Sequence, residues 1–85
     1  MIAIQSIDEL KNHVDEEPYN EFFMRLNGGC RSTKTIQYFK DNDYWYILNH
    51  IDDSVSEYES TKDLIQSEPL IIKAMANNAF FKDKD

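Results

Sequence analysis

Residues 19–59 alternate between apolar and polar side chains, and this period of two constrains the fold more than any other feature of the chain. Successive side chains of an extended strand point to opposite faces of a sheet, so alternation is typical of half-buried strands. Turn-forming residues interrupt the alternation at three places: Asn27-Gly28-Gly29, Asp41-Asn42-Asp43 and Asp52-Asp53. The strands that the pattern predicts are residues 21–26, 33–39, 44–51 and 55–59. Because hairpin-length connections join them, we expect an antiparallel meander.

A helix is expected before the strands. Ser6 precedes Glu9 by three residues, which is the spacing of a capping box. The apolar residues that recur at helical spacing along this segment are Ile7, Leu10 and Val14. Pro18 disfavours helical geometry at the residue before it, so we expect the helix to end near residue 16.

Two more helices are expected after the strands. Ser60 is a suitable N-cap for the first, and Pro69 suits the first turn of the second. The apolar stripe of the last helix consists of Ile71, Ile72, Met75 and Ala79. Asn77-Asn78 indicates the end of that helix, and residues 82–85 are expected to form a flexible, solvated tail.

The resulting order α-β-β-β-β-α-α predicts an α+β fold, with a four-stranded antiparallel sheet packed against helices on one face. If Phe22 and Met24 face the helices, Ile36 and Tyr38 should join them. The strand at 44–51 has large apolar side chains on both sides, so the sequence leaves open which face the helices cover. The other face is expected to expose aromatic surface unless a partner covers it.

The charges are divided between two parts of the chain. The segment 22–40 has no acidic residue and four basic ones: Arg25, Arg31, Lys34 and Lys40. Since the whole chain has a net charge of −7, the remaining residues carry −11. With the rings of Tyr38 and Trp45, these cations are candidate binding residues for single-stranded nucleic acid, because cations neutralise phosphates and rings stack on bases. The acidic remainder would repel a polyanion, and it can itself imitate nucleic-acid phosphates toward a partner protein.

No arrangement of residues predicts catalysis. Cys30 beside Arg31 is a candidate for a reactive thiol, but neither His13 nor His50 stands where a catalytic dyad is indicated, and the cysteine also suits a turn or strand. His50 with Asp52-Asp53 lacks the further ligands that a metal site needs, and the aspartates suit a turn. We therefore expect no enzymatic activity, no metal ion and no cofactor.

Composition favours one cytoplasmic domain that comprises residues 1–85. The chain has no apolar run of the roughly 20 residues that a membrane helix needs. Its first residues lack the basic start and long apolar stretch of a secretory signal. A single cysteine forms no internal disulfide, so nothing depends on an oxidising compartment. We expect no membrane contact.

The string Leu26 to Lys34, LNGGCRSTK, is followed by an aromatic strand, by the sequence NHIDD and by two short helices. In this arrangement the chain resembles, from about Phe22 to Phe81, small uncharacterised proteins of bacteria and of their mobile elements, phages and plasmids. The resemblance implies the α+β fold and a mobile-element context. Those proteins have no established activity, so the resemblance assigns no site residue.

Together these observations favour a non-enzymatic protein-interaction module, one form of which is an accessory or inhibitor protein of a mobile element. Such a module would bind a protein partner, or a second copy of itself, through the exposed aromatic sheet face or the acidic surface. The alternative is nucleic-acid binding through the basic hairpin 22–40.

Overall fold

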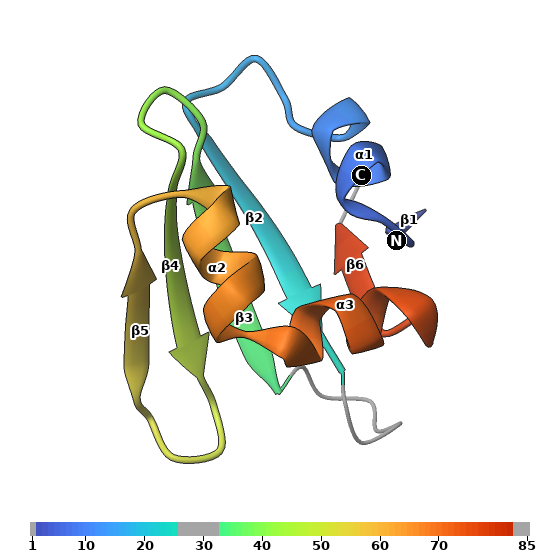
Figure 1. The fold of residues 1–85 in the computed structure, drawn as a ribbon, viewed down its shortest axis with the longest axis vertical. Coiled ribbons are helices and arrows are strands. Elements are labelled where there is room, and N and C mark those ends of the chain that lie inside the picture. Colours follow the sequence, from blue (N-terminus) through green and yellow to red (C-terminus); the bar gives the residue numbers. More distant parts are fainter. Residues whose placement is uncertain (1, 26–32, 83–85) are drawn as a thin grey trace.

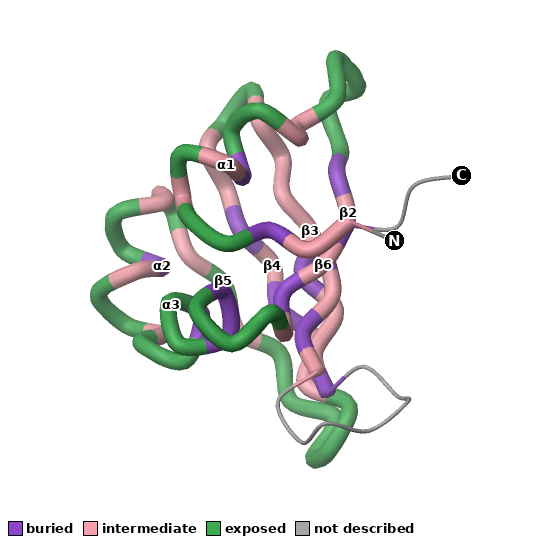
Figure 2. The backbone as a smooth tube through the Cα atoms, turned by 90° about the vertical axis from the view of Figure 1, so that its right-hand side faces the viewer, coloured by how far each residue is buried: buried purple, intermediate pink, exposed green. Residues whose placement is uncertain are grey.

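The structure is a computed structural model that describes residues 2–25 and 33–82 (Figure 1). Its elements in chain order are β1 (Ile2–Ala3), α1 (Ile7–Asn12), β2 (Tyr19–Met24), β3 (Lys34–Phe39), β4 (Tyr44–Asn49), β5 (Val55–Tyr58), α2 (Thr61–Ser67), α3 (Pro69–Ala76) and β6 (Phe80–Lys82). The strands form one antiparallel sheet in the order β1-β6-β2-β3-β4-β5. Figures 1 and 2 both show the described helices on the same side of this sheet, so its other side carries no helix from the described residues.

The prediction of an α+β fold is confirmed, but the sheet of the described residues has six strands instead of four. β2 to β5 pair with their neighbours in sequence, as a meander requires. β6 pairs with β2, and β1 pairs with β6. These two additional strands have three and two residues. They are too short to show an alternation, so their pairing depends on tertiary contacts that periodicity does not report.

The prediction of a flexible tail from residue 82 onward is wrong for Lys82, the last residue of β6. Lys82 is buried, with only 8% of its surface exposed. Its ammonium nitrogen lies 2.8 Å from a carboxylate oxygen of Asp15, and it donates hydrogen bonds to the carbonyl oxygen of His13 (2.6 Å) and Oδ1 of Asn20 (3.2 Å). Lys82 therefore ties the segment after α1 to the sheet. Residues 83–85 lie outside the described part of the chain.

The predicted N-caps agree with the structure. The backbone N–H of Glu9 donates to Oγ of Ser6 at 3.1 Å, and the N–H of Asp63 donates to Oγ of Ser60 at 3.0 Å. Pro69 is the first residue of α3, where its missing N–H costs no intrahelical hydrogen bond. None of the helices in the described ranges has the length and apolar character needed to span a membrane.

α1 ends at Asn12, earlier than the predicted end near residue 16. The N–H of Asp15 donates to Oδ1 of Asn20 at 2.7 Å instead of continuing the helical ladder. Asn20 is buried on β2, and its amide group donates in turn to the carbonyl oxygen of Glu17 at 3.2 Å. A buried side chain from the sheet therefore satisfies the backbone just beyond the helix, which a reading of helical periodicity does not detect.

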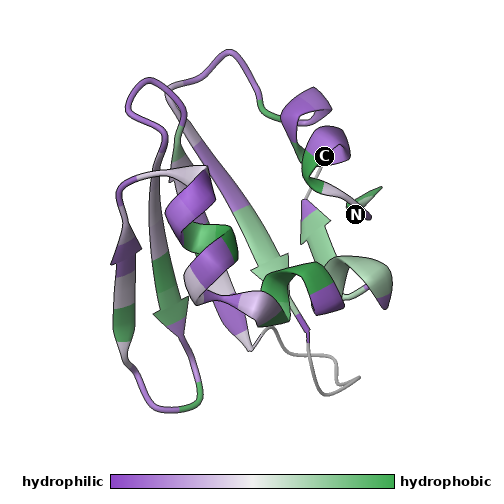
Figure 3. Cartoon of the chain, viewed as in Figure 1, coloured by the Kyte–Doolittle hydropathy of each residue, from purple (hydrophilic) through white to green (hydrophobic). Residues whose placement is uncertain are grey.

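The hydrophobic core lies between the sheet and the helices. Its buried residues are Ile4, Leu10, Phe22, Met24, Ile36, Trp45, Ile47, Leu64, Ile71, Ala74, Met75 and Phe80. Figure 3 shows hydrophobic residues concentrated in α3 and along parts of β2, β4 and β6, with hydrophilic residues in the connecting turns. Tyr38 packs against the core, as the strand parity predicts. On β4 the helices cover the face of Trp45 and Ile47, which settles the question that the sequence left open.

Candidate interaction surface

Tyr38 and Trp45, the two rings of the predicted binding site, lie on the sheet face that the helices cover. Trp45 is only 1% exposed, and its ring centroid lies 4.3 Å from that of Tyr38. The indole N–H donates to Oγ1 of Thr61 at 2.9 Å, and the hydroxyl of Tyr38 donates to Asp43 at 3.1 Å. Both aromatic rings are therefore engaged in the interior packing, and Trp45 has no free face on which a nucleic-acid base can stack.

The predicted cations are engaged at separate places. Lys34 lies on the same face as Ile36, and its ammonium nitrogen is 3.4 Å from a carboxylate oxygen of Glu68 at the start of α3. Only 13% of the Lys34 side chain is exposed. Lys40, just beyond β3, donates from its ammonium group to the carbonyl oxygen of Asp15 at 3.1 Å. These two contacts stabilise the fold and hold both cations close to the protein.

Arg25 lies at the opposite face of the sheet. Its guanidinium carbon is 5.3 Å from the centre of the Phe81 ring, which is the geometry of a cation–π contact. Its Nε is buried and has no hydrogen-bond partner among the described residues. The fourth predicted cation, Arg31, lies outside the described residues. The structure therefore does not bring the described cations, Arg25, Lys34 and Lys40, together with Tyr38 and Trp45 on one platform.

The sheet face away from the helices exposes a different set of side chains, which we call the open sheet face. Strand register places its residues in rows: Tyr19 pairs with Phe39 and Phe39 with Tyr44, while Phe23 pairs with Phe81. Its apolar and aromatic members are Tyr19, Phe23, Phe39, Tyr44, Tyr46, Leu48, Val55 and Phe81. This is the exposed aromatic surface that the two-sided pattern of residues 44–51 predicts.

The open sheet face has an acidic side at β5. Glu57 pairs with Tyr46 across the strands, and burial, the hydrogen bond to Glu57 and the negative charges of Glu57 and Glu59 raise the pKa of Tyr44. On β2 the hydroxyl of Tyr19 donates to Glu21 at 2.5 Å. Tyrosine rings and carboxylates therefore lie side by side across this face.

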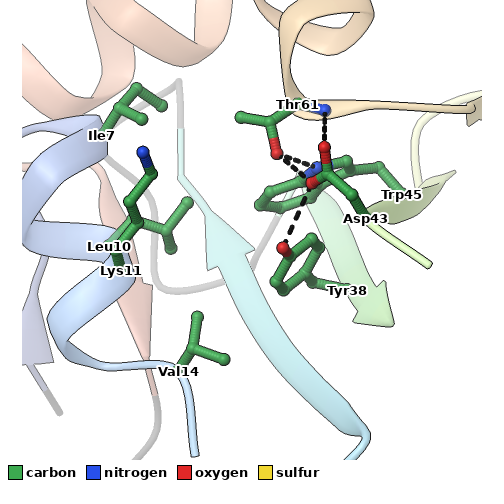
Figure 4. Close-up of a pocket in the computed structure, with 8 residues that line it drawn as sticks. All are labelled: Ile7, Leu10, Lys11, Val14, Tyr38, Asp43, Trp45 and Thr61. Carbon is green, nitrogen blue, oxygen red and sulfur yellow. Dashed lines mark hydrogen bonds between the residues drawn. The ribbon is translucent and has the colours of Figure 1, made fainter. Parts of the chain in front are cut away.

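A cleft of about 380 Å³ lies on the other side of the sheet, beside α1 (Figure 4). One wall is formed by residues of α1 and the segment after it: Ile7, Leu10, Lys11 and Val14. The facing wall is formed by Tyr38, Asp43, Trp45 and Thr61. We call this space the α1 cleft. Figure 4 shows the two groups of side chains facing each other across it.

Asp43 joins the turn between β3 and β4 to the start of α2 on one side of this cleft. Its carboxylate accepts hydrogen bonds from the N–H of Thr61 (3.0 Å), from the hydroxyl of Tyr38 (3.1 Å) and from the hydroxyl of Thr61. Burial by itself would raise the pKa of Asp43, but these hydrogen bonds outweigh burial and hold the pKa below its ordinary value. Asp43 therefore stabilises the fold in its ionised form.

Replacing Asp43 with asparagine is expected to lower the free energy of unfolding at neutral pH by about 1 kcal/mol, because the charged acceptor is lost. Asparagine tolerates the backbone φ of 49° at this position, so the substitution tests the side chain and not the backbone. The folded-state pKa is lowered, so the stabilisation is present above the unfolded-state pKa and is lost as the pH falls through the folded-state value. Urea unfolding at several pH values measures both effects.

The control is Asp41→Asn, an exposed carboxylate in the same turn, which should change the unfolding free energy by less than about 0.5 kcal/mol. Equal stability of the Asp43→Asn variant and the wild type at neutral pH would contradict this account. So would a difference between them that stays constant into the acid range.

The other candidate catalytic and metal-binding residues do not form a site within the described ranges. Nε2 of His50 lies 2.6 Å from Oγ1 of Thr35, while Cys30 falls outside the described residues. The described residues contain no group of three or more His, Cys, Asp or Glu side chains placed to hold a metal ion. Asp52 accepts a hydrogen bond from the N–H of Ser54 at 2.9 Å, which is the turn role that its sequence position indicates.

The role of Asp43 and the position of Lys11 at the α1 cleft are not predicted by the sequence. The position of Asp43 indicates only a turn, and Lys11 has the spacing of an ordinary solvent-facing helix residue. The cleft combines three separated segments, so no local pattern indicates it. Comparison with known proteins adds no assignment: no family model, curated protein sequence or solved structure matches the chain.

Proposed function

We propose that this protein is a non-enzymatic protein-interaction module, and that its open sheet face binds a partner protein whose own contact surface is both basic and apolar. The observation that carries the proposal is the aromatic character of a sheet face that no described helix covers. Tyr19 and Val55 on this face are 40% and 46% exposed. Contiguous apolar patches on a soluble domain commonly mark interaction sites.

The charge of the protein argues for a basic partner. The chain has a net charge of −7, and Glu57 and Glu59 lie beside Tyr44 at the β5 side of the face. The cation nearest this face among the described residues, Arg25, is already held over Phe81 at the far side. Arginine and lysine side chains of a partner would find both carboxylates and tyrosine rings here, and cations bind favourably over such rings. An accessory or inhibitor protein of a mobile element is one form of such a module.

A second copy of the chain fits the open sheet face less well. Each copy carries a net charge of −7, so the like charges of two copies would oppose association. Nucleic acid, the other alternative, would need cations that converge on one face, whereas the described ones are held apart by Glu68, Asp15 and Phe81. Both alternatives are outcomes of the experiment below.

The experiment compares what immobilised variants retain from a host lysate, with and without nuclease treatment. Tyr44→Ala and Glu57→Gln remove one ring and one carboxylate from the open sheet face. Two controls alter the helix side: Ile72→Ala removes an exposed apolar side chain, and Gln66→Lys changes the net charge by the same amount as Glu57→Gln. We expect the open-face variants to retain a basic protein at least about tenfold less well than the wild type, as loss of an interface residue worth about 1.4 kcal/mol would produce. The controls should retain it within about twofold.

A partner retained equally by all variants would contradict the proposal, as would a partner of acidic character. Retention that disappears with nuclease treatment would favour nucleic-acid binding instead. A doubled mass of the purified protein by light scattering would favour the second copy. Thermal unfolding of each variant confirms that differences in retention do not arise from loss of the fold.

A further inference from the structure

We propose that the α1 cleft binds a small carboxylic acid with an aromatic or branched apolar body. The proposal rests on the cleft alone. The cleft lies on the helix side of the sheet, away from the open sheet face, so the two binding functions are separate and each can fail without the other.

The cleft has the dimensions of a small-molecule site. Its volume of about 380 Å³ falls in the range of roughly 300–1,000 Å³ that such sites occupy. At about 30 Å³ for each water molecule in the liquid, this volume has room for about a dozen water-sized groups. A single ring with a short acidic side chain is a ligand of this size.

The walls suit a flat or branched apolar body. Ile7, Leu10 and Val14 face Tyr38 and Trp45 across the cleft (Figure 4). The two rings are held in place before any ligand arrives, since their centroids are 4.3 Å apart and each polar end has its own hydrogen-bond partner. A preformed wall costs less ordering on binding than one that must assemble around the ligand.

The polar groups of the cleft select the charge of the ligand. Asp43 and Thr61 are hydrogen-bonded to each other, so neither requires a ligand group. Lys11 lines the cleft, and within the described residues it makes no ion pair or hydrogen bond through its side chain. A ligand carboxylate would pair with Lys11 and turn away from the carboxylate of Asp43. The apolar body would then lie against Ile7, Val14 and Tyr38, the apolar lining residues that are partly exposed.

Ligand binding can be measured by the fluorescence of Trp45, because Trp45 is the single tryptophan of the chain and lines the cleft. The probes are 3-phenylpropionate and its neutral analogue 3-phenylpropanamide, titrated into the wild-type protein while Trp45 fluorescence is followed. We expect a saturable change with the acid and about fivefold weaker binding of the amide, the upper limit for an exposed ion pair. Lys11→Gln should weaken binding of the acid by a similar factor and leave binding of the amide unchanged.

The matched control is Lys62→Gln, which removes an exposed cation of α2 that does not line the cleft. It should bind the acid within about twofold of the wild type. Amide N–H chemical shifts locate the site, and they should move in α1, in the Asp43 turn and at the start of α2. The proposal is overturned if the acid gives no saturation at millimolar concentrations, if acid and amide bind equally, or if the shifts lie elsewhere.

Discussion

Replacing Trp45 with alanine is expected to lower the free energy of unfolding by about 3–5 kcal/mol, the range for removing a fully buried large aromatic side chain. Trp45 is 1% exposed and packs against the rings of Tyr38 and Phe22, with centroid distances of 4.3 Å and 6.4 Å. Its indole N–H also donates to Thr61, which is left without that donor in the variant. A total stability of about 5–15 kcal/mol is usual for a domain, so this loss would leave the variant only marginally folded.

Urea unfolding followed by far-ultraviolet circular dichroism measures the effect, since the substitution removes the only tryptophan fluorescence. Trp45→Phe separates the two contributions, because it keeps a ring in the core but removes the indole N–H. Its loss should be clearly smaller than that of alanine. A loss below about 1 kcal/mol for Trp45→Ala would contradict the position of this side chain in the core.

The second large effect is expected at Lys82, where substitution by alanine should lower the free energy of unfolding by about 2–3 kcal/mol. The ammonium group is buried and meets three acceptors, on Asp15, His13 and Asn20. Hydrogen bonds to a charged group are individually stronger than neutral ones, and the carbonyl of His13 would lose its donor. Asp15 has 64% of its side chain exposed and can be hydrated in the variant, which limits the loss.

Chemical denaturation of Lys82→Ala beside Lys73→Ala isolates this effect, because Lys73 is an exposed lysine of α3. The Lys73 variant should stay within about 0.5 kcal/mol of the wild type. If the Lys82 variant were as stable as the Lys73 variant, residue 82 would belong to a solvated tail after all, and the pairing of β6 would lose its anchor.

The sequence predicted the elements whose signals are local. Ser6 and Ser60 lie at the expected helix starts because the capping pattern involves residues three apart. The parity of Phe22, Met24 and Ile36 on one face follows from alternation within single strands. These predictions needed no knowledge of which segments meet in space.

The predictions that failed depend on contacts between distant segments. β6 pairs with β2, which precedes it by more than fifty residues in the chain, and it is too short to show a period of its own. The predicted strand 44–51 ends at Asn49, and Ile51 is 72% exposed in the following turn. The apolar side chain of Ile51 favoured a longer strand, although the chain leaves the sheet after Asn49.

The prediction that the cations and rings form one binding site was wrong for a similar reason. The four cations of residues 22–40 are close in sequence, but alternation already places Lys34 with Ile36 and Tyr38, on the side that the helices cover. Whether Arg25 lies on the same sheet face as Lys34 depends on how β2 pairs with β3, and that register is a tertiary property. The net positive charge of residues 22–40 therefore indicated a shared basic surface. The described residues of this segment do not form such a surface in the folded sheet.

We propose that a partner protein binds the open sheet face and not the helix side. The most direct test is hydroxyl-radical footprinting of the protein, free and bound to the basic protein that it retains from the lysate. We predict reduced oxidation of Tyr19, Phe39 and Tyr44 in the complex, with Leu70 and Ile72 on α3 oxidised as in the free protein. Protection of Leu70 and Ile72 with unchanged oxidation of the three open-face rings would contradict the claim.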